Sequence, residues 1–561
     1  MERIWTKHYE PGVPSDLTFE RRTLVEMFEA SCREWADRPA VTFKGRSLTY
    51  RALHEQVDRF ATALAGLGVT TNSRVAYWLP NLPQTVIAYF ATLKLGAQAV
   101  GTHPLYTERE LEHQFNDAGV TVVVTLDYFW WGRLRGMLAR TGVQHVIVTS
   151  IPDYLPFPLN LLAPLKLKKT GQYVKVPPEP RVHFFRELIA QHPPAPPKVE
   201  LDWEHVAALL YTGGTTGLAK GAMLTHRNLS CNVQQCASWF PLVERGREVM
   251  LACLPYCHSF GHTICMLWPL HIGAHIVLAP NPRDIPDLVA SIRKHRVTLF
   301  PAVPALFTAI NNFPGIDRVD ISSVKACFSG SAPLPVDVLQ RFEALTGGKI
   351  TEGFGLTETS PVTHVNPLRG LRKPGSIGVP VPGTDMKIVD PDTGLRELGI
   401  GEEGELCLRG PQVMAGYWQR PEETAAMVRD GWVYTGDLAR VDDDGYTYIC
   451  GRKKDMILVG GYNVYPDEID RVLFSHPKVI EAATVGIPDE KKGERIKSFV
   501  VLRPGVQATA EEIIEYCRHE LAPYKVPKDV AFLPELPKSP MMKVLRRELR
   551  ARELSRQPQP T

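Results

Sequence analysis

The stretch YTGGTTGLAKGAMLTH at 211–226 has the composition of a loop that wraps an anion. It supplies backbone amides at glycines, threonine hydroxyls and one lysine, all of which bind phosphate oxygens. These residues are Gly213, Gly214 and Gly217, then Thr212, Thr215 and Thr216, then Lys220. Because Gly221, not Ser or Thr, follows the lysine, the spacing is not that of a P-loop NTPase. Taken alone, such a stretch is equally a tight turn.

Two later segments add groups that suit a nucleotide. In EGFGLTET at 352–359, a planar base could stack on Phe354, and Glu358 could hold Mg²⁺, a hard cation that prefers oxygen ligands. The segment GWVYTGDLAR places Asp437 after a turn, where a carboxylate can accept both ribose hydroxyls, and GRKKD supplies Arg452. Read separately, Asp437 is a turn residue and Arg452 a surface cation.

Together and in this order, these segments resemble the adenylate-forming enzymes, which include acyl-CoA synthetases, peptide-synthetase adenylation domains and luciferases. The resemblance extends from about TYRALHEQVDRFATAL to KSPMMKVLRREL, nearly the whole chain, and the combination is far more specific than any single motif. It implies two half-reactions: a carboxylate attacks the α-phosphorus of ATP to give acyl-AMP and pyrophosphate, and a thiol then releases AMP. The glycine-rich loop would cradle the β- and γ-phosphates.

The resemblance implies roles for the phosphate-binding residues. The segment 212–220 matches the phosphate loop, with Gly213 where many relatives have Ser. Thr212 and Glu358 match positions near Mg²⁺, and Thr357 matches the contact to the α-phosphate.

It also implies a nucleoside site. Asp437 and Arg452 match the ribose contacts, and Lys454 matches the hinge of the lid. The walls that bind adenine lie in FSGSAPLP and EGFG, where a Phe replaces the commoner Tyr. Their residues are Gly330, Ser331, Ala332, Glu352, Gly353, Phe354 and Gly355.

Further matches concern the acid and the thiol. Lys543 in PKSPMMK matches the lysine that bridges the carboxylate and the α-phosphate, although Met542 replaces the usual preceding Gly. Such a mobile cation would offset the repulsion between the two anions in the transition state. His258 matches a histidine near the carboxylate, and Gly460 and Gly461 match a channel for the pantetheine arm.

The segment 254–298 resembles the long-chain fatty acyl-CoA synthetases more than the acetyl, aryl or amino-acid branches. An apolar slot would suit an alkyl chain, since each buried methylene contributes about 0.8 kcal/mol. We expect this slot to be lined by Phe260, His262, Val303 and Leu306. In some relatives the position of His262 is a tryptophan that gates the fatty-acid tunnel.

The same region contains possible zinc ligands, namely Cys253, Cys257, His258, His262 and Cys265. Their spacing fits no common zinc module, and buried cysteine acting as a small hydrophobe is the favoured interpretation.

Composition narrows the class of protein. The chain has 561 residues, enough for two or more domains, and its formal charge of +3 gives no electrostatic footprint for nucleic acid. The 10 cysteines form no CxxC pair, which favours a reducing compartment. The N-terminus is charged where a signal peptide needs an apolar core, and Lys94 interrupts the best candidate for a membrane span. We therefore expect a cytoplasmic protein.

Alternating patterns predict an α/β multidomain fold. Apolar residues at helical spacing mark 50–69 and 83–96, and short apolar runs at 73–80 and 120–126 predict buried strands. Strand, helix and strand at this spacing imply parallel sheets covered by helices. We expect a large N-terminal adenylation domain, 1–453, and a small, mobile α+β lid domain, 454–561.

The segment 151–197 differs in composition from the rest of the chain, because it mixes prolines, large apolar residues and lysines. It is either a surface excursion or a patch that contacts a membrane peripherally. The second interpretation involves Tyr154, Leu155, Phe157, Leu161, Leu162, Lys166, Lys168 and Lys169.

Three hypotheses follow. The leading one is a long-chain fatty acid–CoA ligase that uses ATP, Mg²⁺ and coenzyme A. The others are a fatty acyl-AMP ligase that loads an acyl carrier protein and a non-enzymatic lipid-binding descendant of the fold. The presence of Glu358, Asp437, Arg452 and Lys543 together argues against a binding protein. Whether the protein forms a homodimer is left open.

Overall fold

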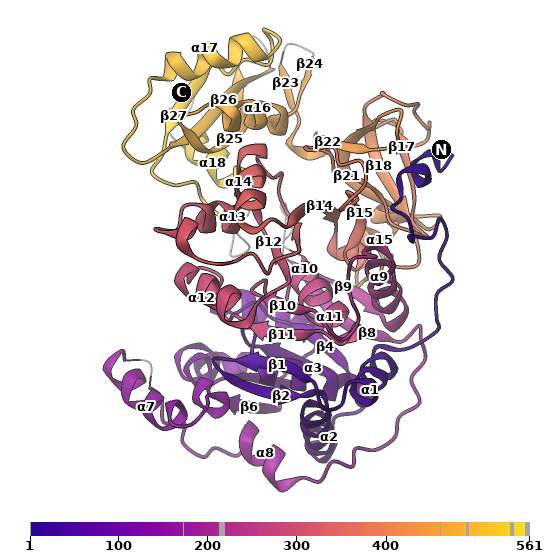
Figure 1. Cartoon of the computed structure of the whole chain (residues 1–561), viewed down its shortest axis with the longest axis vertical. Helices are drawn as coiled ribbons and strands as arrows, with labels where there is room; N and C mark the ends of the chain where they lie inside the picture. The colour runs from indigo at the N-terminus through magenta and orange to yellow at the C-terminus, as the bar shows by residue number, and fades with distance from the viewer. Residues whose placement is uncertain are drawn as a thin grey trace.

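The computed structural model describes residues 2–171, 173–212, 219–459, 462–489, 493–538 and 544–555. Figure 1 shows a large body formed by the N-terminal part of the chain and a smaller unit, yellow, at one end of the long axis. The predicted fold class, α/β with a large N-terminal and a small C-terminal domain, is confirmed.

The first sheet of the body has the strand order β16-β15-β14-β13-β12-β10-β11-β1-β2. Neighbours from β1 to β14 run parallel, whereas β2, β15 and β16 are antiparallel to their partners. The strands are β1 (Pro39–Phe43), β2 (Arg46–Thr49), β10 (Val249–Ala252), β11 (His275–Leu278), β12 (Leu299–Ala302), β13 (Ala326–Ser329), β14 (Lys349–Gly355), β15 (Val362–Val365) and β16 (Val379–Pro380).

The second sheet has the order β19-β9-β8-β4-β3-β5-β6-β7 and is parallel from β8 to β7. Antiparallel pairing of β8 with β9 and of β9 with β19 ends the sheet on one side. The strands are β3 (Arg74–Trp78), β4 (Gln98–Gly101), β5 (Val122–Leu126), β6 (His145–Thr149), β7 (Val182–Phe184), β8 (Val206–Thr212), β9 (Lys220–Thr225) and β19 (Gly416–Tyr417).

A helix that is buried on every side lies between these sheets. In α3 (Pro83–Lys94) every residue from Pro83 to Leu93 is buried, and the helix contacts β1 of the first sheet and β3 and β4 of the second. Such a helix is stable only when all its faces are covered. Its one charged residue, Lys94, forms ion pairs with Glu29 and Asp58. These two carboxylates balance the positive charge of Lys94 next to the core.

Other helices pack around α3 and against the strands, since α1 (Leu24–Glu34) and α2 (Tyr50–Gly66) contact α3, and α12 (Ile285–His295) contacts β10. The predicted helix at 50–69 is α2, and Gly68 follows it with a φ of +82°. The main ones besides are α4 (Glu108–Ala118), α8 (Phe185–Gln191), α9 (His226–Trp239), α10 (Ser259–His262), α11 (Trp268–His271), α13 (Pro304–Asn311), α14 (Val336–Thr346) and α15 (Pro421–Met427). Shorter ones are α5 (Asp127–Phe129) and α6 (Arg135–Met137).

A third, antiparallel sheet completes the body with the order β17-β18-β21-β20, and β22 pairs with β21. Its strands are β17 (Asp385–Val389), β18 (Gly404–Arg409), β20 (Val428–Arg429), β21 (Trp432–Val441) and β22 (Thr447–Arg452).

The C-terminal unit is an α+β sandwich with its own core. It comprises β23 (Ile457–Val459), β24 (Tyr462–Val464), β25 (Val479–Asp489), β26 (Gly493–Leu502), β27 (Asp529–Phe532), α16 (Pro466–Ser475), α17 (Ala510–Glu520) and α18 (Arg546–Leu554). The chain changes sheet between Arg452 and Ile457, and an ion pair of 3.7 Å between Arg503 and Asp337 also joins the unit to the body. The domain boundary at 453/454 stays a prediction.

The segment 151–197 contains α7 (Leu159–Lys169) besides β7 and α8, and α7 projects from the body in Figure 1. None of the helices in the described ranges combines the length and the apolar character needed to cross a bilayer. All 10 cysteines are buried free thiols. Within the same ranges, no group of three His, Cys, Asp or Glu side chains is placed to hold a metal ion.

Candidate active site

The ends of the predicted phosphate loop are held by a pair of antiparallel strands. Thr212, the last residue of β8, pairs with Lys220, the first residue of β9. A Cβ atom at Gly221 would lie 3.0 Å from the ring of Tyr211, so the close approach of this ring favours glycine directly after the lysine. Predicted loop residues Gly213, Gly214, Thr215, Thr216 and Gly217 lie outside the described residues.

Glu358 and Lys220 both contact Tyr417 because β19 pairs with β9, and Lys220 itself pairs with Glu423 at 3.9 Å. The strand pairing places Tyr417 opposite Ala222, and the Tyr417 hydroxyl donates a hydrogen bond of 2.6 Å to Oε1 of Glu358. The Lys220 ammonium lies 5.2 Å from the centroid of the Tyr417 ring. Both Glu358 and Tyr417 are buried.

The electrostatics of this group favour an oriented carboxylate. Burial, followed by the neighbouring Glu358 charge, raises the pKa of Tyr417, so its hydroxyl remains protonated and a donor at neutral pH. Sequence reasoning missed Tyr417, because nothing in GYW distinguishes it from a core tyrosine. Only the long-range strand pairing brings it to Glu358.

Thr357 lies beside the segment that carries His258. Both Thr357 and Glu358 belong to a single helical turn, η7 (Thr357–Thr359), and Oγ1 of Thr357 is 3.3 Å from Oγ of Ser259. His258 caps α10, since its Nδ1 accepts the backbone N–H of Phe260 at 3.3 Å. The structure therefore brings the predicted α-phosphate and carboxylate contacts close together.

The proposed adenine walls come from the ends of β13 and β14. Ser329, the last residue of β13, is the register partner of Glu352 in β14. Gly330, which follows β13, therefore lies beside the EGFG segment of β14. A Cβ atom at Gly330 would meet the ring of Phe260 at 3.2 Å. Ser331, in the left-handed region with a φ of +72°, and Ala332 are exposed.

The second wall is rigid. A Cβ atom at Gly355 would lie 2.0 Å from the carbonyl oxygen of Pro361, and one at Gly353 would lie 3.2 Å from that of His364. The half-buried ring of Phe354 packs edge-on against His364 at 6.2 Å between centroids. Close backbone packing thus explains the glycines that flank the aromatic residue.

Glu352 holds two neighbouring loops in place by hydrogen bonds. Its carboxylate accepts the backbone N–H groups of Leu334 at 3.2 Å and Gly375 at 3.3 Å. Burial raises the pKa of Glu352, and these two bonds partly offset that effect. Glu352 therefore positions loops in this structure.

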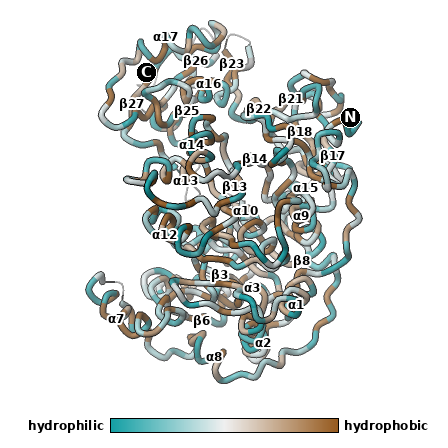
Figure 2. The backbone as a smooth tube through the Cα atoms, in the orientation of Figure 1, coloured by the Kyte–Doolittle hydropathy of each residue, from teal (hydrophilic) through white to brown (hydrophobic). Residues whose placement is uncertain are grey.

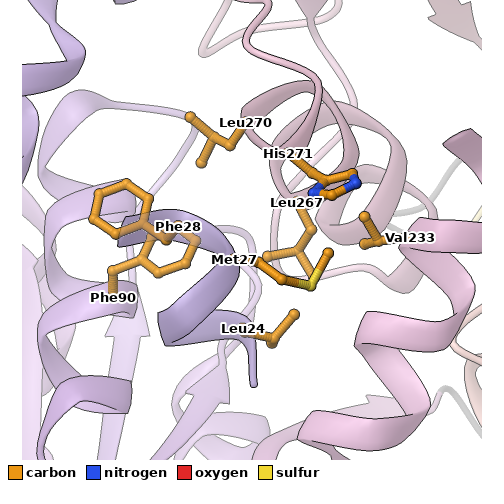
Figure 3. Close-up of a pocket in the computed structure, with 8 residues that line it drawn as sticks. All are labelled: Leu24, Met27, Phe28, Phe90, Val233, Leu267, Leu270 and His271. Atoms are coloured by element: carbon orange, nitrogen blue, oxygen red, sulfur yellow. The ribbon is translucent and has the colours of Figure 1, made fainter. Parts of the chain in front are cut away.

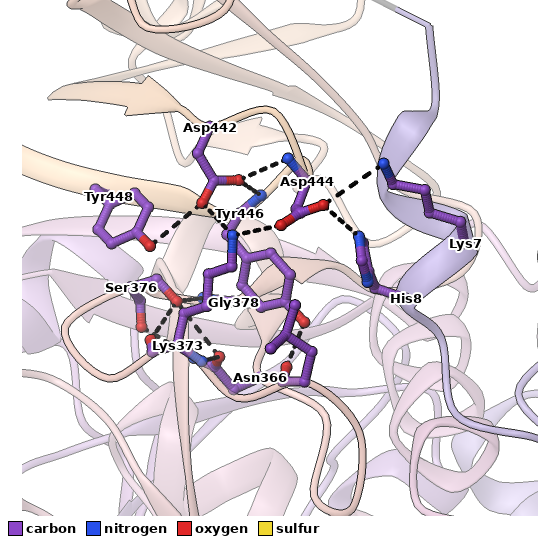
Figure 4. A network of polar contacts seen from close by, with 11 residues as sticks. Lys7, His8, Asn366, Lys373, Ser376, Gly378, Asp442, Asp444, Tyr446 and Tyr448 are labelled. Carbon is purple, nitrogen blue, oxygen red and sulfur yellow. Dashed lines mark hydrogen bonds and ion pairs between the residues drawn. The ribbon is translucent and has the colours of Figure 1, made fainter.

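A polar network holds the loop that contains Gly375 (Figure 4). Lys373 pairs with Asp442 at 2.6 Å and with Asp444 at 2.8 Å, and Asp444 also contacts His8 at 3.0 Å. The Lys373 hydrogen bond is the largest cause that lowers the pKa of Asp444 to about 2. The N-terminal segment, the third sheet and the adenine wall are joined through these side chains.

The predicted ribose contacts are already paired with each other. Asp437 on β21 and Arg452 on β22 are register partners, and Nε of Arg452 lies 2.9 Å from Oδ1 of the buried Asp437. Desolvation, followed by the charge of Arg452, lowers the pKa of Lys454. The predicted hinge residue thus adjoins the predicted ribose site.

The proposed acyl slot contains a neutral histidine. His262 is fully buried, its ring packs edge-on against Tyr89 at 4.9 Å, and burial lowers its pKa to about 3. Neither ring nitrogen has a hydrogen-bond partner among the described residues. Leu306 is buried, whereas Phe260 and Val303 are half-buried.

A separate cavity of about 10 Å³ lies where α1, α3, α9 and α11 meet (Figure 3). Its lining residues are Leu24, Met27, Phe28, Phe90, Val233, Leu267, Leu270 and His271. It is a packing defect that is too small for an acyl chain.

Three predicted residues of the C-terminal unit lie outside the described residues. Lys543 falls in a segment whose flanking residues Lys538 and Val544 are bridged. Gly460 and Gly461 fall between β23 and β24, where Val459 pairs with Tyr462.

Comparisons with known proteins define the class. Residues 28–418 match the family model of the AMP-binding enzyme, and residues 468–543 match that of the AMP-binding enzyme C-terminal domain. The chain therefore belongs to the AMP-binding enzyme family, and the resemblance inferred from the motifs is confirmed.

Individual relatives narrow the class further. The chain is 43% identical to a long-chain-fatty-acid–CoA ligase of Bacillus subtilis over 98% of both chains. It is also similar to the solved structure of the anthranilate CoA ligase AuaEII in complex with anthranoyl-AMP, with 27% identity, a TM-score of 0.85 and coverage of 96% and 98%. A third match is ATP-bound MatB from Rhodopseudomonas palustris, with 28% identity, a TM-score of 0.83 and coverage of 95% and 99%.

Proposed function

We propose that this protein is an AMP-forming ligase that activates long-chain fatty acids with ATP and transfers the acyl group to coenzyme A. The observation that carries the proposal is the cluster after β14, where Glu358 and Lys220 meet at Tyr417. Burying a carboxylate costs folding free energy, and a protein that only bound lipid would have no use for one at this position. The full-length similarity to the Bacillus subtilis long-chain ligase supports the choice of acid.

In the proposed first half-reaction, an oxygen of the fatty acid carboxylate attacks the α-phosphorus of ATP. The bond from that phosphorus to the bridging oxygen breaks, and pyrophosphate leaves with the electron pair. Lys220 and the 213–217 loop offset the charge of the leaving group, and the hydroxyl of Thr357 donates toward an α-phosphate oxygen. Lys543 would bridge the two reacting anions.

Magnesium fits the donor set of this cluster. Glu358 and Thr212 offer the hard oxygen ligands that Mg²⁺ prefers, and the Tyr417 hydroxyl fixes the carboxylate in one orientation. When bound, the ion would neutralise phosphate charge. Phe354, with Asp437 and Arg452, would hold the adenosine.

In the second half-reaction the thiol of coenzyme A loses its proton to solvent and its sulfur attacks the acyl carbonyl carbon. The bond from that carbon to the phosphate oxygen breaks, and AMP leaves with the electron pair. We assign Gly460 and Gly461 to the channel for the pantetheine arm, because a narrow passage favours residues without side chains. Lys454 would act at the hinge of the C-terminal unit.

The test is ATP–pyrophosphate exchange with fatty acids of increasing length, from butanoate to octadecanoate, followed by direct assay of AMP and acyl-CoA. We expect dodecanoate to octadecanoate to exceed acetate and benzoate by at least about a hundredfold in kcat/KM, since a few buried methylenes supply that ratio. An acetate or benzoate optimum would overturn the substrate assignment. Acyl-AMP that accumulates in the presence of coenzyme A, and is consumed by an acyl carrier protein, would instead favour a fatty acyl-AMP ligase.

A further inference from the structure

Helix α7 exposes a large apolar surface at the edge of the body. The side chains concerned are 47–79% exposed. They are Phe157, Leu159, Leu161, Leu162 and Leu165. Figure 2 shows that α7 lies away from the sheets, and no residue of the helix is buried. Exposed apolar side chains gathered on one projecting segment mark a candidate interaction site.

The charge of the segment favours an anionic partner. No acidic residue occurs between Asp153 and Glu179, whereas the last turn of α7 carries Lys166, Lys168 and Lys169. These lysines form no ion pair within the described ranges, and Nζ of Lys168 lies over the ring of Tyr173 at 4.8 Å. Apolar residues in the first half of the helix and lysines in the second suit an interface between acyl chains and negative headgroups.

A cleft of about 500 Å³ adjoins the inner side of α7. Asn160 of α7 and Tyr154 line it, together with Arg46, Arg59, Arg186, Glu55, Gln56, Asp153, Ala52, Ile189 and Ala190. Its acidic groups are engaged, since Glu55 pairs with Arg59 at 2.8 Å and Asp153 accepts the hydroxyl of Thr149 at 3.0 Å. Arg186 is exposed and forms no ion pair in the described part of the chain. Three arginines and two carboxylates line the cleft, so its formal charge is +1 next to the apolar surface.

We propose that α7 and this cleft form a binding surface for anionic phospholipid membranes. The leucines of α7 enter the boundary between headgroups and acyl chains, the lysines lie among the headgroups, and Arg186 meets a headgroup phosphate. The surface requires neither ATP nor fatty acid, so it is independent of the proposed ligase activity.

The test is sedimentation with vesicles of phosphatidylcholine alone and of phosphatidylcholine with phosphatidylglycerol, in the absence of substrates. We expect binding to the anionic vesicles to exceed binding to the neutral ones by at least about tenfold, and to fall with added salt. Binding to both the anionic and the neutral vesicles should be abolished in the triple variant Leu161→Glu, Leu162→Glu and Leu165→Glu. The matched control is Leu395→Glu, Ile400→Glu and Val506→Glu together, which places the same three charges at apolar side chains that are 38–82% exposed elsewhere.

The charged groups are tested separately. The triple variant Lys166→Gln, Lys168→Gln and Lys169→Gln should lose the preference for anionic vesicles by at least about tenfold. A control triple, Lys198→Gln, Lys294→Gln and Lys528→Gln, removes the same charge from exposed lysines outside the surface. Arg186→Gln should weaken anionic binding relative to Arg318→Gln. Melting temperature and ATP–pyrophosphate exchange with octanoate should be unchanged in all of them, because the sites are exposed.

Several outcomes would overturn the proposal. These are equal effects of the α7 variants and their controls, binding that is insensitive to phosphatidylglycerol, or no vesicle binding by the unaltered protein. Self-association that is lost in the leucine variant, without vesicle binding, would show that a second copy of the chain covers α7 instead.

Discussion

The cluster at Glu358 and the surface of α7 depart from the usual placement of residues in opposite ways. One buries a carboxylate, and the other leaves leucines in water. At Glu358 the buried carboxylate accepts a hydrogen bond from Tyr417, whereas nothing in the described chain covers the leucines of α7. Because each arrangement costs folding free energy, the comparison indicates that both are retained for interactions with other molecules.

The first way to test this comparison is to remove the buried charge. Glu358→Gln should lower the rate of ATP–pyrophosphate exchange by about a hundredfold to a thousandfold, the range seen when a group that stabilises transition-state charge is lost. The matched control is Glu520→Gln, an exposed residue of the C-terminal unit, which should leave the rate unchanged. An unaltered rate in Glu358→Gln would show that the carboxylate is structural only.

The second test contrasts two apolar helices. Ile87→Ala in α3 removes atoms from a fully buried side chain and should lower the free energy of unfolding by about 2–5 kcal/mol. Leu162→Ala in α7 should change it by less than about 0.5 kcal/mol, since the side chain is 53% exposed. Urea unfolding followed by tryptophan fluorescence measures both. Comparable losses in the free energy of unfolding would mean that Leu162 is packed in solution. In that case α7 would offer no exposed apolar surface to a membrane.

The third test concerns the partner of the buried carboxylate. Tyr417→Phe deletes the hydroxyl that orients Glu358 and should lower the rate of adenylation about tenfold, because a hydrogen bond to a charged group is lost. The Mg²⁺ concentration needed for half-maximal rate should rise in parallel. Tyr434→Phe, which deletes a hydroxyl bonded to the carbonyl of Gly394, is the control. If the Mg²⁺ dependence stays the same while the rate falls, Tyr417 does not act through the metal site.

The smallest effect is expected from the polar network at the surface. The pKa of Asp444 is about 2 in the folded protein, below its ordinary value of 3.8. The ionised carboxylate therefore stabilises the fold above pH 3.8, and this contribution is lost as the pH falls from 3.8 toward 2. Asp444→Asn should lower the melting temperature slightly at pH 6, and the difference from the unaltered protein should narrow below pH 3.8. A difference that is constant with pH would contradict the role of the charge.

Much of the architecture could be predicted because it depends on local patterns. The apolar residues at helical spacing in 83–96 predicted α3, and the short apolar runs of β3 and β5 predicted buried parallel strands, although β4 between them was not recognised. The residues expected to bind nucleotide, such as Asp437 and Arg452, are close because adjacent strands pair them.

Contacts that arise only from distant pairing could not be predicted. Tyr417 reaches Glu358 through the β9–β19 pairing, and Glu352 supports loops instead of simply lining a wall. The preference for glycine at 221 comes from the ring of Tyr211, which no sequence spacing reveals. In each case, the cause is a neighbour supplied by a different strand.

The burial of all 10 thiols has a practical consequence for labelling chemistry. Burial raises the pKa of each one, so little thiolate is present at neutral pH and maleimide reagents should not react with the folded protein. A cysteine introduced at an exposed position such as Leu162 would therefore react selectively, without removal of any native cysteine. An environment-sensitive dye at that position would report directly on whether α7 leaves water when vesicles are added.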